Sequence, residues 1–473
     1  MSETQSFSEA GPGSALHVSP ATDVAFVRDV MVPAEAAPPG TTGALGWLRA
    51  NLFSSPLNVI QTLIAVALVA LIVPPLLQFG VVEAVWRGED RTVCATEVQG
   101  GIRPNGWIGA CWAYVGAYVD EFTYGDYPRS QRWRVNLTFV LLGLALIPLL
   151  VRSFPFKKLG ILFSAVVFPV SAFILLTGGE LEYDGFLPTG FLADPGALKF
   201  WLDYALFSAI LLGLVYAVVR STGGGAGGAL RAVGILLLGI AAVLFFCSVD
   251  FGLRHVRTEL WGGMLVTLVI AVSGIAASLP LGILLALARR SNMPLIKILA
   301  VTFIEFWRGV PLVTVLFMSS VMLPLFASEG VSIDKLLRAL IGVALFASAY
   351  MAEVVRGGLQ AIPKGQYEGA AAMGLSYWQS MRLIVLPQAL TISIPGIVNT
   401  FIGLFKDTTL VLIIGLFDFL GKIQQTFSDP TWATPVQSKT AYLFAAVVYF
   451  LFCFGMSRYS IYMERRLDTG HKR

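Results

Sequence analysis

The side chains in this sequence that are best suited to chemistry are ionisable groups inside apolar runs. Lys406 and Asp407 are neighbours in a segment predicted to cross a membrane at about 389–419. An ionisable group at the bilayer centre costs about 2.5–3.5 kcal/mol on insertion scales, so such groups are usually paired and often functional. The pair could be structural and lock two helices together. Alternatively, Lys406, Asp407, Thr408 and Thr409 could border a solute path, where the two charges would meet both charges of a zwitterion.

Two further pairs of opposite charge stand three residues apart, which places both members on one face of a helix. Glu353 and Arg356 predict a salt bridge near one end of an apolar run, and a gate is the alternative. Glu305 and Arg308 precede a glycine and a proline, so a kink stabilised by an ion pair is expected there. A proline and an asparagine at 395 and 399 could open backbone groups toward a cavity. The candidate pathway residues are Lys406, Asp407, Thr408, Thr409, Asn399, Glu305 and Glu353.

A polar, small-residue stretch, KGQYEGAAAMGLSYWQSMRLIVLPQAL, lies between two of the most apolar segments. Gly374 is expected to end one short helix there, and Ser376 to cap the N-terminus of the next. The alanines and Gly369 leave a flat face on which another backbone can approach closely, and Glu368 supplies a single charge. An ordinary connecting loop is the alternative. We favour a helix that is held by a partner protein, because it has little apolar surface of its own.

The four cysteines divide into two pairs. Cys247 and Cys453 fall in apolar runs, as expected for small buried hydrophobic residues. Cys94 and Cys111 share a long polar loop, and a disulfide between them is plausible if that loop faces an oxidising compartment. No cysteine or histidine spacing predicts a metal site.

The composition indicates the elements that position these groups. Apolar residues make up 56% of the chain and charged residues 13%, whereas soluble proteins carry about 25% charged residues. Runs that approach the roughly 20 residues of a bilayer span predict an all-α polytopic membrane protein with about ten transmembrane helices. The expected spans are 57–78, 135–151, 159–177, 200–219, 232–249, 262–288, 297–324, 336–355, 389–419 and 440–458.

The loops predict the orientation and the division of the chain. Short loops rich in Lys and Arg, separated by even numbers of spans, place both termini in the cytoplasm and the long loop 79–133 in the periplasm. Residues 1–50 are expected to form a disordered cytoplasmic tail. An N-terminal five-span block at 51–250 and a C-terminal block at 251–473 follow, without an internal repeat. The net charge of +4 is scattered, so nucleic acid is not an expected partner.

The stretch at about 363–387 resembles the "EAA-x3-G-x9-I-x-LP" signature of bacterial ABC importer membrane subunits. The matching residues are Glu368, Gly369, Ala370, Gly374, Ile384, Leu386 and Pro387. Glycine stands at 369 where alanine is usual. "FWRGVPL", "LPQAL" and "LFKDTTL" are similar to the polar amino acid permeases of the histidine, glutamate, glutamine and arginine group. "GACWAYV" and "RWRVNL" are similar to the M-type subunit of general L-amino acid (Aap/Bzt-like) transporters.

The resemblance implies a type I importer core in the last five spans, with coupling helices that dock on a cytoplasmic ABC ATPase dimer. It also implies a second, related permease subunit, a periplasmic amino-acid-binding protein and an L-amino acid substrate in the bacterial inner membrane. ATP and Mg would bind the ATPase, since this sequence has no G-x4-GK-[ST] loop; Gly421-Lys422 is followed by Ile423. No cofactor and no enzyme activity are therefore expected of this chain. An ion-coupled secondary amino acid transporter is the alternative, although it needs no coupling signature.

Overall fold

The structure is a computed structural model that describes residues 43–151, 153–179, 197–221, 226–326 and 333–467. Within these residues, nine helices are long and apolar enough to cross a membrane, and a tenth span is a bent pair of helices. The expected all-α fold with about ten spans is confirmed. Most of the expected tail, the acidic segment after Gly179 and the last six residues lie outside the described residues.

The chain divides into two compact units, residues 1–75 and residues 76–473. The first unit contains α1 (Gly43–Asn51) and all but the last two residues of α2 (Pro56–Leu77), and the Thr62 hydroxyl donates to the Leu52 carbonyl at 2.9 Å. Residues 43–50 are thus helical, not disordered as expected, because apolar side chains at 45, 47 and 48 recur at helical spacing. The boundary expected near residue 250 separates two blocks of five spans. The division into units at residue 75 does not test that boundary.

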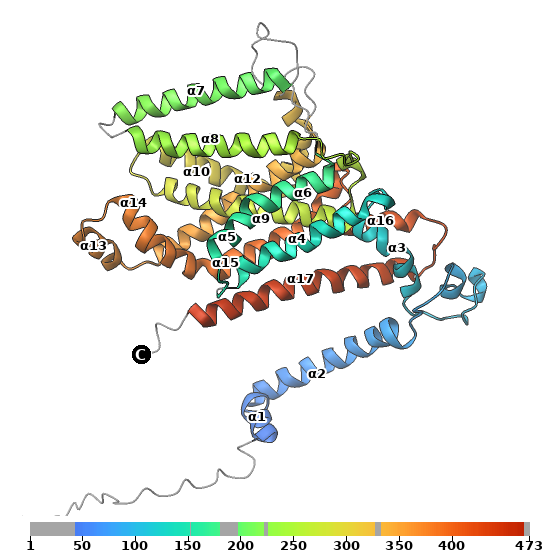
Figure 1. Cartoon of the computed structure of the whole chain (residues 1–473). Helices are drawn as coiled ribbons and strands as arrows, with labels where there is room; N and C mark the ends of the chain where they lie inside the picture. Colours follow the sequence, from blue (N-terminus) through green and yellow to red (C-terminus); the bar gives the residue numbers. More distant parts are fainter. Residues whose placement is uncertain (1–42, 152, 180–196, 222–225, 327–332, 468–473) are drawn as a thin grey trace, which may run out of the picture. The chain divides into compact units, whose positions relative to one another are not determined.

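The second unit contains the remaining helices, most of which run alongside one another (Figure 1). From its N-terminal part come α3 (Trp112–Tyr124), α4 (Arg132–Leu150), α5 (Lys157–Leu162), α6 (Phe168–Thr177), α7 (Ala197–Ser221) and α8 (Ala226–Ser248). From its C-terminal part come α9 (Gly263–Arg289), α10 (Pro294–Gly309), α11 (Leu312–Val321), α12 (Lys335–Gln360), α13 (Lys364–Ala372), α14 (Tyr377–Ser380), α15 (Leu386–Asp407), α16 (Phe419–Gln425) and α17 (Gln437–Leu467).

The core of this unit forms where α12 packs against α9 and α15. Small residues permit this close approach, as is usual between membrane helices. A Cβ on Gly282 would stand 2.6 Å from Met351, and one on Gly358 would stand 2.0 Å from the Ser393 hydroxyl. Any side chain at these two glycines would push the three helices apart.

The span expected at 297–324 is broken. Pro294–Gly309 and Leu312–Leu325 meet at 104°, which confirms the kink expected after Glu305 and Arg308. Pro311 accounts for it, because proline lacks the backbone N–H that would continue the helix. The bend places the C-terminal turn of α10 beside α12.

The N-terminal part of the unit is tied to the core by polar contacts. Buried Arg134 of α4 donates to the carbonyls of Leu175 and Arg254, the latter at 2.8 Å. Lys422 of α16, whose side chain is 3% exposed, pairs with Asp126 at 2.6 Å. These contacts join the polypeptide before α4, the end of α6 and the core.

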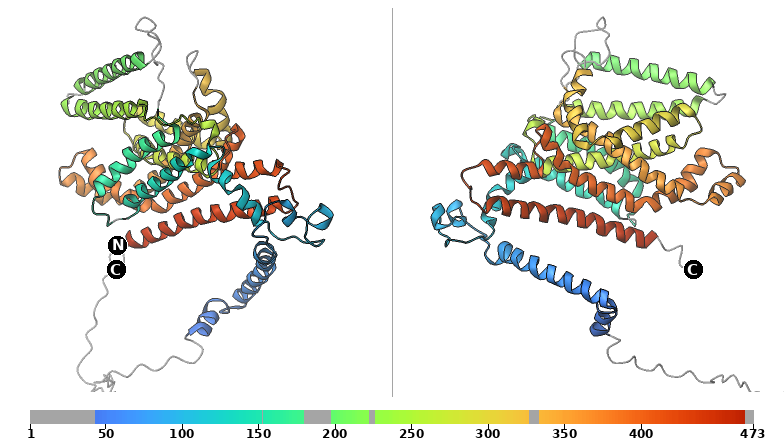
Figure 2. Two further views of the ribbon diagram at one scale, coloured as in Figure 1. Left: turned by 45° about the vertical axis from the view of Figure 1, so that its right-hand side comes forward. Right: turned by 180° about the vertical axis from the view of Figure 1, so that it is seen from behind.

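The loop expected at 79–133 contains a helix, α3. Its helix α3 packs through Tyr114, Tyr118 and Phe122 against α16 and α17. Cys94 and Cys111 form a disulfide in the structure, a pairing on which the sequence did not decide, and both cysteines are buried. Figure 2 shows this region at the end of the helices opposite to α13 and α14.

Candidate functional site

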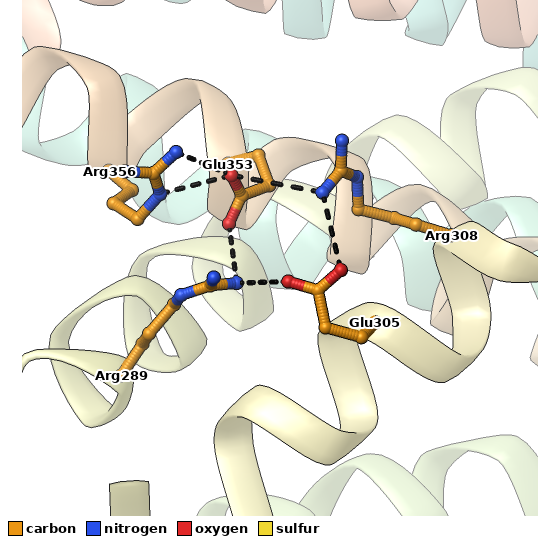
Figure 3. Close-up of polar contacts among 5 residues, drawn as sticks. All are labelled: Arg289, Glu305, Arg308, Glu353 and Arg356. Atoms are coloured by element: carbon orange, nitrogen blue, oxygen red, sulfur yellow. Dashed lines mark hydrogen bonds and ion pairs between the residues drawn. The ribbon is translucent and has the colours of Figure 1, made fainter.

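Five charged side chains from three helices meet in one network (Figure 3). Arg289, at the end of α9, reaches Glu305 of α10 and Glu353 of α12, each at 2.8 Å. Arg356 contacts Glu353 at 2.7 Å, so the salt bridge expected from their spacing is confirmed. Arg308 lies 3.8 Å from both Glu305 and Glu353. The bend after α10 is what allows α10 to contribute two members.

The charges in this network do not cancel, because three guanidinium groups surround two carboxylates. The Glu353 side chain is the most enclosed, with 16% exposed, while that of Glu305 is 52% exposed. Glu353 accepts hydrogen bonds from Arg289 and from two nitrogens of Arg356, at 2.8, 2.7 and 3.0 Å. Glu353 is therefore the centre of the network, and one positive charge remains for an anionic group such as a carboxylate.

Sequence reasoning found four of these five residues but missed the part played by Arg289. Its partner Glu353 lies 64 residues away in the chain, so no helical spacing connects them. The remaining signal in the sequence is the position of Arg289 at the end of an apolar run, and such a position indicates only the orientation of the span.

A short polar projection, formed by α13 and α14, extends beyond the ends of the spans (Figure 1). Gly374 adopts a left-handed φ of +70° and ends α13, as expected. Ser376 caps α14 in a reciprocal arrangement with Gln379, which is also confirmed. Glu368 and Gly369 are exposed, whereas Ala370 is buried. One face of α13 thus packs inward and the other is free among the described residues.

The projection is fastened to the spans by specific contacts. Arg290 of α9 donates to the Tyr367 hydroxyl at 3.0 Å and to the Leu359 carbonyl at 3.1 Å. Gln388 of α15 donates to Gln366 at 3.0 Å. Movement of α13 would therefore be transmitted to α9, α12 and α15 together. Since Arg290 follows Arg289, the α9 end joins the projection to the charge network.

The remaining signature residues lie where the projection enters α15. Ile384 is in a single π-helical turn, Met381–Val385, and Leu386 and Pro387 begin α15. Two exposed rings of α14 precede this turn: the exposed fraction is 67% for Trp378 and 52% for Tyr377. Such side chains at the tip of a polar projection indicate a protein-binding surface.

Lys406 and Asp407 lie at the C-terminal end of α15, near the end of the candidate span Tyr377–Ile414. The helix continues beyond them as a 3₁₀ turn, Thr408–Ile414. Among the described residues neither side chain takes part in a salt bridge, and the structural role of the pair stays a prediction. Thr408 and Thr409 donate to the carbonyls of Phe405 and Lys406, at 2.9 and 3.1 Å. Lys406 and Asn399 are exposed.

The chain is similar to known proteins over nearly its whole length. Residues 278–469 match the family described as "Binding-protein-dependent transport system inner membrane component". The chain is 43% identical to the "Inner membrane amino-acid ABC transporter permease protein YhdY" of Escherichia coli (strain K12), over 93% of this chain and 97% of that protein. It is also 43% identical to the "Glutamate/glutamine/aspartate/asparagine transport system permease protein BztC" of Rhodobacter capsulatus, over 95% and 100%.

A solved structure titled "Crystal structure of an amino acid ABC transporter with histidines" matches with 29% identity and a TM-score of 0.39. That match covers 43% of this chain and 92% of the other.

Proposed function

This chain belongs to the amino-acid ABC transporter permeases, in the family of binding-protein-dependent transport system inner membrane components, and on that premise we propose how its residues serve import. It is the membrane-spanning permease subunit of an L-amino acid importer and forms half of the pathway. The C-terminal five spans are the type I importer core. The ion-coupled alternative has no support among the long relatives, which are named as ABC permeases.

The projection of α13 and α14 is the coupling element in this proposal. A separate ATPase dimer, which binds ATP and Mg, holds the exposed face around Glu368 and Gly369. When that dimer closes, it moves α13, and the contacts of Arg290 and Gln388 carry the movement into α9, α12 and α15. This chain itself makes and breaks no covalent bond. The single observation that carries the proposal is the exposed signature helix, hydrogen-bonded to three spans.

The five-residue charge network is the gate in this proposal, which is the alternative role that the sequence offers for Glu353 and Arg356. Its ion pairs connect α9, α10 and α12, so a movement of α9 relative to α12 would break them. The excess guanidinium charge could attract the substrate carboxylate as the pairs open. Lys406, Asp407, Asn399, Thr408 and Thr409 remain proposed pathway residues, because Lys406 and Asp407 place both signs of charge at the end of α15, where they can meet both charges of a zwitterion.

The proposed assembly also contains a second, related permease subunit and a periplasmic amino-acid-binding protein. The chain lies in the inner membrane with both termini and α13 in the cytoplasm, and the disulfide-bonded loop in the oxidising periplasm. This orientation agrees with the positions of α13 and α3 at opposite ends of the second unit (Figure 2).

The test is substitution of Glu368 by arginine in the complex purified with its native partners. We expect loss of the co-purifying ATPase and of uptake driven by the binding protein, because a reversed charge would face the ATPase groove. Glu89→Arg, the same change at an exposed residue of the opposite end, is the matched control and should retain the ATPase. Retention of the ATPase and of uptake in Glu368→Arg would exclude the coupling assignment.

Orientation and energy source need two further measurements. A cysteine at Glu368 should react with a membrane-impermeant thiol reagent in inverted vesicles alone. Uptake should cease when the partner ATPase is made catalytically inactive while the membrane potential is intact. Uptake that persists under that condition would favour ion coupling.

A further inference from the structure

A groove of about 940 Å³ lies between the N-terminal part of the second unit and its core. Helices α4 and α6 form one wall, and α9 and α12 form the other. Its volume is near the top of the range of about 300–1,000 Å³ that is usual for ligand sites. It is distinct from the charge network, with which it shares no residue.

The wall of the groove is suited to hydrocarbon. Apolar side chains of four membrane-spanning segments line it. Its hydroxyl groups are largely occupied within the protein: Thr138, Ser164 and Thr177 donate to backbone carbonyls at 2.9, 2.6 and 2.8 Å. These groups offer no free donor to a polar ligand, and a fatty acyl chain is the apolar occupant that a membrane supplies.

The mouth of the groove is polar and carries both signs of charge. Arg257 pairs with Glu259 through two contacts at 3.0 and 3.1 Å, and Thr258 donates to Asp334. Hydrogen bonds from Arg257 hold the pKa of the Glu259 carboxyl below its ordinary value, so Glu259 is ionised at neutral pH. Two carboxylates lie there beside the Arg257 guanidinium, the Lys335 charge also acts on Glu259, and His255 is part of the lining, so neither sign of charge dominates. These groups complement a headgroup that carries an ammonium as well as a phosphate.

One buried donor marks the junction between the apolar wall and this mouth. The Trp261 side chain lines the groove, its residue is 7% exposed, and its Nε1–H has no acceptor among the described residues. Buried N–H groups rarely lack a partner, so an unpaired one on a residue that lines a groove points to an acceptor on an occupant of that groove. The ester carbonyl of a phospholipid lies at this junction between chain and headgroup.

We propose that the groove is a binding site for a zwitterionic phospholipid of the phosphatidylethanolamine type. An acyl chain fills the space between α4, α6, α9 and α12, and an ester carbonyl accepts the Trp261 hydrogen bond. The headgroup lies by Arg257, Glu259 and Asp334. The lipid comes from the leaflet opposite α13 and joins the N-terminal spans to the core.

The test uses the full chain with its native partners in nanodiscs that contain phosphatidylethanolamine with a photoreactive acyl chain. We expect cross-linking to peptides of α6 and α9, mapped by mass spectrometry. Trp261→Phe, which removes the donor and keeps the ring, should lower this labelling about fivefold, as the loss of one hydrogen bond predicts. Trp86→Phe, at an exposed ring outside the groove, is its control.

A second variant blocks the site without removing the donor. Ala172→Trp, in the groove wall, should lower the labelling more than tenfold, whereas Ala217→Trp, on an exposed face of α7, should not change it. Unchanged labelling in both Trp261→Phe and Ala172→Trp would overturn the proposal. The absence of labelling in the groove of the wild-type protein would also overturn the proposal. That result is expected if a helix of a partner subunit covers the groove. Equal or stronger labelling by photoreactive phosphatidylglycerol would refute the headgroup assignment.

Discussion

Neutralising Glu353 should damage the charge network far more than neutralising Glu305, although both are Glu→Gln changes. Glu353 accepts three hydrogen bonds from guanidinium groups, at 2.7–3.0 Å, and lies 3.8 Å from a third guanidinium. Glu305 is close to one guanidinium, at 2.8 Å, and more distant from a second, at 3.8 Å. The two residues thus provide a matched comparison within a single network.

The expected loss of stability in each variant follows from the burial of the side chain and the number of its contacts. Removing one partner of a buried ion pair costs about 3–5 kcal/mol, because it leaves the other charge uncompensated. The guanidinium groups here are 24–36% exposed, so we expect the low end, about 3 kcal/mol, for Glu353→Gln. The Glu305 side chain is 52% exposed, so Glu305→Gln should cost at most about 1 kcal/mol. The two losses differ by about 2 kcal/mol. At about 1.4 kcal/mol per factor of ten, the unfolding equilibrium constants of the two variants therefore differ by about 25-fold.

The assay is the unfolding equilibrium of each variant in mixed micelles, with double-mutant cycles. Glu353→Gln combined with Arg356→Gln should show a coupling free energy above about 1 kcal/mol, since the two side chains are in direct contact. A gate also predicts that basal ATPase activity of the complex, without binding protein, rises more in Glu353→Gln than in Glu305→Gln. Equal losses of stability in the two single variants, or coupling to Arg356 close to zero, would refute this reasoning.

Three further predictions concern the backbone, the disulfide and a buried arginine. Gly374→Ala should destabilise the end of α13 by about 1–2 kcal/mol and lower ATPase co-purification, because φ is +70° at this residue. Gly369→Ala should keep wild-type uptake, because there is open space around its Cα. Cys94→Ser should lower stability by about 3 kcal/mol, because the cystine closes a loop of 17 residues, and should expose that loop to protease, whereas Cys453→Ser should do neither. Arg134→Met should lower the free energy of unfolding by about 2–3 kcal/mol in thermal unfolding assays, because it leaves two carbonyl groups without a donor. Wild-type stability of this variant would contradict the proposed role of the Arg134 contacts.

Local features could be predicted because their causes are local. Spans follow from uninterrupted apolar runs, and the cap at Ser376 and the break at Gly374 follow from short-range backbone chemistry. The contact between Glu353 and Arg356 follows from helical spacing. The signature from Glu368 to Pro387 indicated the family on residue types at fixed intervals. In each case the neighbours in space are also neighbours in the chain.

By itself the sequence determined the all-helical membrane class, the coupling stretch and the candidate charges. The tertiary structure alone brought Arg289 to Glu353, ended α15 at Asp407 and left the Trp261 donor unpaired beside a groove. It also joined Lys422 to Asp126, 296 residues apart. The physical reason is that such contacts depend on how helices pack and bend, and glycines such as Gly282 and Gly358 set that packing through the space they leave empty.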